Sequence, residues 1–582
     1  MADYAVSDYN GDSGCIFLRE GVGSSSDIPT NTFAIQFFYP PTSQPCPWDF
    51  VKPGREIADA RQDIAQDLVG GWMSKCVNEH TTCHRPVSSL PTRVIDVGKT
   101  SEDKVSLHIS SGCMGQYAAL SHCWGTHMPL QTTRKNLEEH CSSIAMTRLP
   151  QTFRDSVELC RMLNIRFLWI DSLCIIQDDP DDWEAEVSRM GKVYYDAHLV
   201  LAASQAKDSS GGLFNKLGES VHQSMHVGTV HDSSGAESKI HVNVTPIGNN
   251  IMLHWHSMAL LNSPLACRAW ALQEHILASK IVHFTRTEIY WECSSTVACE
   301  CMIMDHSQAE SECIRRERIF RPHSTKEEYL EGPFSHSIPE SSSLLWLELL
   351  SKYFSRHTTY ESDRLPAIAG LASYLKSHGA SEYIGGLWKK DLARSLLWTA
   401  IPTVRRDPRR VNGSPTWSPF CADLSKNTQK QTTISFGWSG GHDIYPFELK
   451  YFIHDIDVHC TPSRPDPFGR ISSGMLRLRG KTLPIRSLDH GDRVTFARLG
   501  HNDTSMVVYW DVDPHEVDKD RLYFLLVAQR TDRPETRGLL LQSCIGEELT
   551  YQRVAIACQN PDGAEEMAAA FDGVNETELT II

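Results

Sequence analysis

Three polar or aromatic side chains follow two short apolar runs of the sequence at the point where each run ends. Ser121 closes the run 117–121, and Trp124 follows it after two residues. Asp171 comes directly after the run 167–170. The carboxyl ends of parallel strands meet at one edge of a sheet, where doubly wound α/β proteins bind their ligands. We therefore expect Ser121, Trp124 and Asp171 to lie at one rim as ligand-binding residues.

A second group of candidate residues begins at Arg268. Trp270 and Glu274 are four residues apart, and this spacing places both side chains on one face of the helix that we expect from about Trp270. The indole could then wall a pocket into which the carboxylate points. Arg268 could bind a phosphate through two hydrogen bonds or bridge the edge of the sheet. Glu274 could instead pair with Arg268 or His275.

Structural explanations also fit several of these residues. Trp124, Trp169 and Trp270 have the character of core aromatic residues. Asp171, at a strand end, could cap the following turn through backbone amides. Each of these positions is therefore open to a structural interpretation beside the functional one.

Cysteine and histidine residues cluster in the N-terminal part of the chain. Cys76, His80, Cys83 and His84 have the spacing of metal ligands near a helix end. A zinc finger needs a second pair of ligands at a fixed distance, which this sequence lacks, so we assign no metal to them. The 18 cysteines of the chain are expected to be mostly buried free thiols, because a reducing compartment disfavours disulfides.

Strands and helices alternate through the region that holds the first group of candidates. Short connections between them predict a doubly wound, mostly parallel sheet. Gly125 is expected to turn the chain at the carboxyl edge of the first strand. The expected strands are 93–97, 117–121, 167–170, 199–203, 280–284 and 289–293, and the expected helices lie near 56–75, 136–141, from 152, over 187–197 and from about 270.

The 582 residues are too many for one core, and a rule of about 150 residues per domain suggests three or four units. The final part of the chain alternates apolar and polar positions in short runs, which indicates β structure. We expect a loose N-terminal arm (1–55), a docking helix and strand (56–116), an α/β domain (117–301) with an insertion at 218–260, a polar linker (302–343), a helical lobe (344–425) and a β-rich C-terminal domain (426–582).

The charge balance argues against a nucleic acid partner. The chain has 56 Lys and Arg residues against 72 Asp and Glu residues, for a net charge of −16, which repels phosphate backbones. No run approaches the roughly 18 apolar residues that span a bilayer, and the N-terminus lacks the pattern of a signal peptide. We expect a protein of the cytoplasm or nucleus that binds neither membrane nor nucleic acid.

Several multi-residue motifs, in the same order along the chain, resemble the fungal heterokaryon incompatibility (HET) domain. The resemblance covers roughly residues 60–560 and does not depend on any single short motif. The matching segments are Tyr117–Gly125, Leu149–Val157, Leu168–Asp178, Asp182–Ala197, Pro264–Leu265, Arg268–Glu274, Tyr290–Cys293, Asp363–Gly370, Gly386–Trp388 and Ser414–Ser418.

This resemblance implies a role in non-self recognition after hyphal fusion, where an activated allele triggers growth arrest or cell death. HET domains are also thought to be distant relatives of TIR domains, which implies a TIR-like or flavodoxin-like fold. Several TIR domains cleave NAD with one glutamate that commonly lies four residues after a tryptophan. The resemblance therefore implies that Glu274, after Trp270, stabilises the oxocarbenium-like state as nicotinamide leaves. NAD would then be a substrate, and no cofactor is expected.

Three functions remain open at this stage. The first is a cell-death effector that cleaves NAD or associates with copies of itself, in response to an unknown incompatibility partner. The second is a non-enzymatic recognition or scaffold module whose C-terminal β domain senses a partner. The third is a divergent enzyme of small-molecule metabolism. The sequence has no Walker loop, Rossmann glycine fingerprint or metalloprotease helix, which excludes ATPases, ordinary dehydrogenases and zincins.

Overall fold

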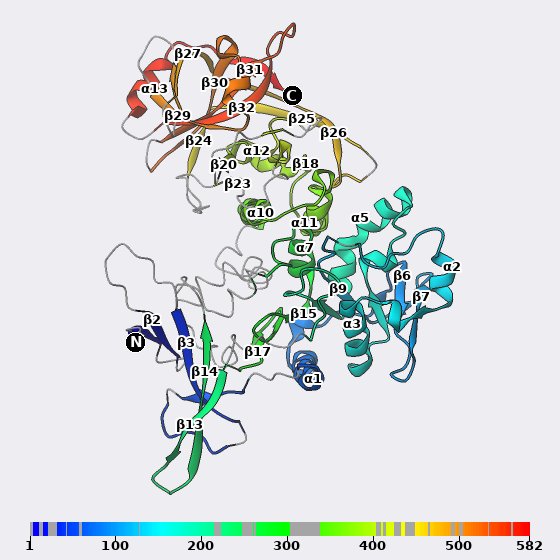
Figure 1. Cartoon of the computed structure of the whole chain (residues 1–582). Helices are drawn as coiled ribbons and strands as arrows, with labels where there is room; N and C mark the ends of the chain where they lie inside the picture. The colour runs from blue at the N-terminus through cyan, green and yellow to red at the C-terminus, as the bar shows by residue number, and fades with distance from the viewer. Residues whose placement is uncertain are drawn as a thin grey trace. The chain divides into compact units, whose positions relative to one another are not determined.

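The computed structural model of the chain (Figure 1) divides into two compact units, Met1–Leu330 and Glu331–Ile582. None of the helices in the described part of the chain combines the length and the apolar character needed to cross a membrane. The structure describes residues 4–10, 15–20, 32–41, 43–49, 51–56, 61–126, 128–214, 223–246, 260, 263–302, 338–402, 409–410, 415–423, 432–436, 448–463, 466–490, 495–499, 505–532, 535–559 and 563–582.

The first unit contains a nine-stranded mixed sheet whose central four strands run parallel. Their residues are buried apart from the half-buried Phe167, which explains the continuous apolar sequences. The predicted α/β sheet is thus confirmed at its centre, and antiparallel strands extend it at both edges. In spatial order the strands are β10 (Ile144–Ala145), β7 (Lys104–Ile109), β6 (Arg93–Asp96), β11 (Phe167–Trp169), β9 (Tyr117–Ser121), β12 (Leu199–Ala202), β15 (Lys280–Phe284), β16 (Ile289–Cys293) and β17 (Val297–Cys299).

Helices cover both faces of this sheet. They are α1 (Arg61–Glu79), α2 (Leu137–Ser142), α3 (Gln151–Met162), α4 (Asp171–Cys174), α5 (Pro180–Asp196) and α7 (Trp270–Leu277). In Figure 1, α5 and α7 lie on one side of β9 and α3 on the other, and α1 packs against α3 and β16. The start of α5 is fixed locally, because the Asp179 side chain accepts hydrogen bonds from two backbone amides of its first turn and Pro180 takes the first helical position.

The order of the parallel strands creates a switch point at their carboxyl edge. In chain order, β9 is the first of the four, and it lies between β11, the second, and β12, the third. The first connection thus runs from β9 to its neighbour on one side, β11, and the next connection runs from β11 to the neighbour on the other side of β9, β12. Right-handed crossovers then place the helices on opposite faces, so open α/β sheets bind ligands beside the carboxyl ends of two such strands. Ser121 ends β9 at this position.

The turn after β9 requires glycine. Gly125 has a φ of +78°, and a Cβ built there would lie 2.2 Å from the Cβ of Asp208, in the segment after β12. The left-handed backbone and this close approach both exclude a larger residue. The role expected for Gly125 at the strand edge is therefore confirmed.

Replacing Gly125 with alanine should lower the free energy of unfolding by about 2–4 kcal/mol, because the methyl group adds a steric clash to the strain of a positive φ. Urea denaturation followed by tryptophan fluorescence would measure this change. Gly112→Ala is the matched control, since Gly112 has a φ of +80° and a Cβ added there would meet nothing within 4 Å. Equal losses in the two variants would contradict the close approach to Asp208.

The N-terminal segment, expected to be a loose arm, contains strands in the structure. They form a six-stranded sheet with the hairpin that makes up the described part of the 218–260 insertion. β3 pairs with the neighbouring β2 on one side and with β14, about 200 residues later, on the other, and no local pattern could indicate the second pairing. The strands are β1 (Tyr4–Asn10), β2 (Cys15–Glu20), β3 (Thr32–Tyr39), β4 (Lys52–Pro53), β13 (Gln223–His231) and β14 (Glu237–Pro246).

The second unit begins with a part that mixes helices and short strand pairs. Most of the expected linker lies outside the described residues, and α10 starts at Ile338, within the range expected for that linker. The elements of this part are α10 (Ile338–Phe354), α11 (Pro366–Ser377), α12 (Leu392–Ser395), β18 (Tyr383–Ile384), β19 (Leu387–Trp388), β20 (Thr399–Pro402), β21 (Arg409–Arg410), β22 (Ala422–Asp423) and β23 (Thr432–Ser435).

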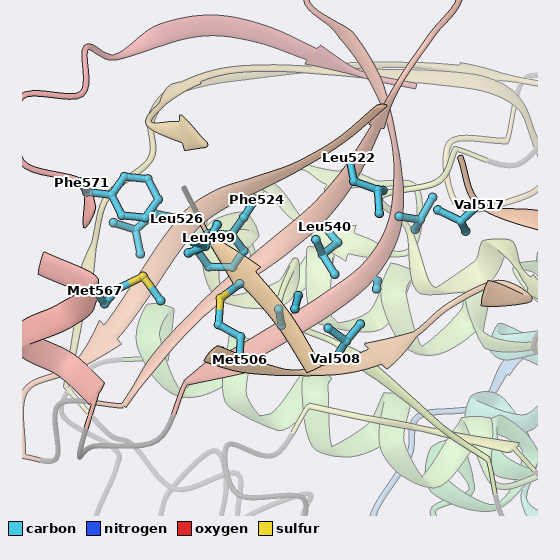
Figure 2. Close-up of a cluster of buried hydrophobic side chains, with 14 residues drawn as sticks. Leu499, Met506, Val508, Val517, Leu522, Phe524, Leu526, Leu540, Met567 and Phe571 are labelled. Atoms are coloured by element: carbon cyan, nitrogen blue, oxygen red, sulfur yellow. The ribbon is translucent and has the colours of Figure 1, made fainter. Parts of the chain in front are cut away.

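Six antiparallel strands close into a β-barrel at the C-terminus, because the last of them pairs with the first. Apolar side chains fill the barrel, and Figure 2 shows Leu499, Phe524 and Leu540 among them. The helix α13 (Ala564–Ala570) adds Met567 to this cluster. The barrel strands, in order of pairing, are β27 (Thr482–His490), β28 (Thr495–Leu499), β29 (Ser505–Trp510), β32 (Thr550–Gln559), β31 (Thr536–Ser543) and β30 (Leu522–Arg530); β24 (Leu449–Tyr451), β25 (His454–Pro462), β26 (Ile471–Gly480) and β33 (Thr577–Ile581) extend its sheet.

Candidate active site

A buried carboxyl group lies at the carboxyl end of the central strand β9. Glu274, on α7, is only 3% exposed, and the Ser121 hydroxyl at the end of β9 donates a hydrogen bond to its carboxylate. Tyr194, on α5, faces the same carboxyl group, and its hydroxyl donates a hydrogen bond to the Leu120 carbonyl oxygen at 3.0 Å. One strand and two helices therefore hold this carboxyl group in place.

The surroundings of Glu274 keep it close to half ionised at neutral pH. Burial is the largest effect and raises the pKa of Glu274 to about 7. The nearby Arg268 guanidinium and the hydrogen bond from Ser121 act in the opposite direction, while the charge of Asp171 adds to the increase. A carboxyl group with a pKa near the working pH can exist in either protonation state, as acid–base catalysis requires.

Asp171 organises the neighbouring part of the rim. The Trp124 indole donates a hydrogen bond to one carboxylate oxygen of Asp171 at 2.8 Å, and the Ser172 amide donates to the other at 2.7 Å. Asp171 therefore makes the local backbone contact expected of a cap and, in addition, fixes the indole. Trp124 is half-buried, so one part of its ring stays accessible beside the site.

His122 is a neutral imidazole in this environment. Its Nδ1 atom lies 3.9 Å from Asp171, and its ring meets the Phe153 ring edge-on at 5.1 Å. Burial lowers the pKa of His122 to about 4, and this decrease exceeds the opposing effect of Asp171. The Nε2 atom is buried and meets no hydrogen-bond partner among the described residues. This atom is therefore able to accept or donate a hydrogen bond to a ligand at the site.

Arg268 and Trp270 border the site from the segment that leads into α7. The Arg268 guanidinium donates a hydrogen bond to the His122 carbonyl oxygen, so it bridges the sheet edge, which is one of the two roles considered for it. Trp270 is half-buried at the first position of α7, one turn before Glu274. Glu274 hydrogen-bonds Ser121, whereas His275 hydrogen-bonds Glu292 at 2.9 Å.

The structure brings together most of the residues singled out in the sequence. Ser121, Trp124 and Asp171 lie at one sheet edge, and Glu274 reaches the same edge from a helix that follows much later in the chain. Sequence reasoning missed Tyr194 and His122 as members of the site. The position of Tyr194 at helical spacing predicts a core residue, and only the tertiary structure shows that its hydroxyl faces Glu274. His122 could have been predicted from the sequence because it lies between two candidate residues, Ser121 and Trp124.

The fold and the site define an α/β protein with a buried carboxyl group at the carboxyl edge of a parallel sheet. Residues 117–274 match the family model described as heterokaryon incompatibility protein (HET), so this part of the chain is a HET domain, as its motifs predicted. The matched region begins at the first residue of β9 and ends at Glu274. A HET domain implies a role in heterokaryon incompatibility. No curated protein and no solved structure matches the chain.

Proposed function

We propose that this chain is a heterokaryon incompatibility effector of fungal cells that hydrolyses NAD at the nicotinamide–ribose bond through Glu274. The observation that carries the proposal is the buried Glu274 carboxyl beside Ser121, at the switch point of the parallel sheet. The strand order of the four parallel strands is that of flavodoxin-like folds, to which TIR domains are related. We also propose that the fold of this α/β domain is related to that of TIR domains.

The proposed reaction needs only one carboxylate. The bond between the nicotinamide nitrogen and the ribose carbon breaks, and its electron pair leaves with nicotinamide, which departs as a neutral molecule. Positive charge develops on the ribose, and ionised Glu274 stabilises this oxocarbenium-like state. Water adds to the ribose carbon and loses a proton, for which the carboxylate is the nearest base. The products are nicotinamide, ADP-ribose and a proton.

Other residues of the site have supporting roles in this mechanism. Ser121 holds the Glu274 carboxylate through its hydroxyl group. The half-buried indoles of Trp124 and Trp270 offer flat apolar surfaces for the nicotinamide ring. Arg268 offers a cation for the diphosphate of NAD once its contact with the His122 carbonyl is exchanged. Each role depends on substrate reaching a carboxyl group that is almost fully covered.

That burial is consistent with an enzyme that stays inactive until it is triggered. Glu274 is 3% exposed, so NAD can reach it only after the residues that cover it move. We propose that self-association, or contact with an incompatibility partner, drives this movement inside the cell. The same burial favours a second candidate function, a non-enzymatic interaction module in which Glu274 has a purely structural role.

Nicotinamide release separates these two candidates. The purified full-length chain would be incubated with NAD over a range of protein concentrations that includes self-associated states, and nicotinamide would be followed by chromatography. Release that increases more steeply than protein concentration is expected if association opens the site. Absence of release at every concentration, with self-association verified by light scattering, would exclude an enzyme that self-association activates and favour the interaction module.

The rate of nicotinamide release should rise with pH through about 7. The pKa of Glu274 is raised to about 7 by burial, so the carboxyl group is protonated and uncharged below that value and ionised above it. Only the ionised form stabilises a cationic ribose. Initial rates measured from roughly pH 5.5 to 8.5 at saturating NAD would give the profile. A rate that is flat or decreases across this range would contradict the assignment of Glu274 as the stabilising carboxylate.

A further inference from the structure

Three cysteines and one histidine gather at a second place in the first unit, outside the candidate active site. They are Cys76, His80, Cys83 and Cys293. Their potential ligand atoms all lie within 4.8 Å of one another, and the Cys293 sulfur lies 3.4 Å from Nδ1 of His80. The three cysteines are buried, with exposed fractions of 2% or less.

The geometry of this cluster fits one tetrahedral metal ion. Zinc binds cysteine sulfur at about 2.3 Å and histidine nitrogen at about 2.0 Å, so two ligands of a tetrahedral site lie about 3.5–3.8 Å apart. The observed separation of the Cys293 sulfur and the His80 nitrogen, 3.4 Å, is close to the lower end of this range. Three thiolates and one imidazole are one of the common donor sets of structural zinc sites. Calcium and magnesium prefer oxygen ligands, which this cluster does not offer.

Separate elements bring the four ligands together. Cys76 lies in the last turn of α1, His80 directly follows that helix, and Cys83 ends the short 3-10 helix η1 (Thr81–Cys83). Two backbone hydrogen bonds fix the turn between these ligands. The His80 amide donates to the Cys76 carbonyl oxygen, and the Cys83 amide donates to the His80 carbonyl oxygen. Cys293 comes from the end of β16, more than 200 residues later.

The sequence pattern grouped His84 with the first three ligands. In the structure, Nε2 of His84 lies 2.6 Å from the Val77 carbonyl oxygen, and Cys293 completes the cluster instead. One residue from the end of β16 thus takes the place of the second ligand pair that a zinc finger would carry nearby.

The charges around the cluster also fit a bound metal. Three thiolates and a neutral imidazole around Zn²⁺ leave one net negative charge, which a buried site must balance. Lys280, at the start of β15, is 3% exposed, and its ammonium group donates to the Cys83 carbonyl oxygen at 2.9 Å. The structure shows no carboxylate paired with Lys280 among the described residues. The Ser295 hydroxyl lies 3.5 Å from the Cys83 sulfur, where it can donate a hydrogen bond to a bound thiolate.

We propose that Cys76, His80, Cys83 and Cys293 bind one structural Zn²⁺ ion. The ion joins the C-terminal end of α1 to the end of β16, the strand next to the last in the nine-stranded sheet. It uses all four protein ligands and keeps no open position, so it has a structural role rather than a catalytic one. This proposal does not depend on NAD hydrolysis.

Metal analysis of the intact protein tests the site. The full-length chain, produced with zinc in the medium and purified under reducing conditions without chelators, should contain about one zinc per chain. Cys293→Ala should lower bound zinc at least about tenfold after dialysis, because it removes a ligand that lies far away in the sequence. Cys160→Ala is the matched control, since Cys160 is a fully buried thiol of α3 outside the cluster, and it should keep the metal.

Two further measurements keep the test decisive if Cys293→Ala does not fold. Replacement of the metal in the wild-type chain by Co²⁺ should give the ligand-field and thiolate charge-transfer absorption of a tetrahedral sulfur-rich site. His80→Cys should retain the metal, because four thiolates also bind zinc, whereas His80→Ala should lose it. A wild-type chain that takes up neither Zn²⁺ nor Co²⁺, or a disulfide between Cys293 and Cys76 or Cys83 in the protein as isolated from cells, would overturn the proposal.

Discussion

Glu274→Gln should reduce nicotinamide release by about 100–1000-fold while leaving the fold intact, which is the largest effect on activity that we expect from one substitution. Glutamine has the same shape and can still accept the hydrogen bond from Ser121 through its amide oxygen. It cannot carry the negative charge that stabilises the cationic ribose. Initial rates of nicotinamide release at pH 8 would measure the loss.

The same substitution should stabilise the protein at alkaline pH. The pKa of Glu274 in the folded state, about 7, is above the ordinary value of 4.5, so the fold binds this proton more tightly than the unfolded chain does. Between these two values, stability decreases as pH rises, and above pH 7 the whole cost of a buried charge is present. Glu274→Gln removes that cost, so its gain in unfolding free energy should be about 3 kcal/mol at pH 8 and close to zero at pH 4.

Glu288→Gln provides a matched control for both effects. Burial also raises the pKa of Glu288 to about 7, but this residue lies in the turn between β15 and β16, where it accepts hydrogen bonds from Tyr290 and the Cys301 amide. It should show a comparable pH-dependent change in stability with unchanged nicotinamide release. If Glu274→Gln keeps wild-type activity, or if both variants lose activity equally, Glu274 is not the catalytic carboxylate.

The convergence of the site residues was predictable only in part. Ser121 ends β9 and Asp171 follows the end of β11, and the carboxyl ends of parallel strands share one sheet edge. Glu274 joins them because α7 leads into β15, which pairs with β12 on the far side of β9. The strand order that makes this possible depends on contacts between distant segments, which local periodicity does not reveal.

Long-range pairing also explains what the sequence did not indicate. The N-terminal strands β1, β2 and β3 pair with one another, and β3 also pairs with a hairpin inserted into the α/β domain, a contact that the N-terminal residues alone do not indicate. The fourth ligand of the proposed zinc site, Cys293, lies at the end of β16, whereas local spacing favours His84. In both cases the missing partner is roughly 200 residues away, beyond the reach of turn and capping rules, which act over a few residues.

Arg553 should dominate the stability of the second unit in a way that composition and periodicity do not predict. Its side chain is fully buried on β32, where Nε donates to Asp511 at 2.7 Å and the two terminal nitrogens donate to the carbonyl oxygens of Leu396 and Trp398, each at 2.5 Å. The guanidinium also stacks on the Trp398 ring, 3.5 Å from its centre. One side chain thus joins the barrel to the segment after α12.

Arg553→Met should therefore lower the free energy of unfolding of this unit by about 3–5 kcal/mol, because it leaves the Asp511 carboxylate buried without a partner. The double variant Arg553→Met, Asp511→Leu removes that unpaired charge and should recover part of the loss, although the two carbonyl oxygens remain unpaired. Arg530→Met is the control, since Arg530 pairs with the half-exposed Asp532, and it should cost about 1 kcal/mol or less. Guanidinium denaturation would measure all three. If Arg553→Met and Arg530→Met lower the free energy of unfolding equally, the buried ion pair does not determine the stability of the unit. If the double variant is no more stable than Arg553→Met, the loss comes from the unpaired carbonyl oxygens and the lost stacking rather than from Asp511.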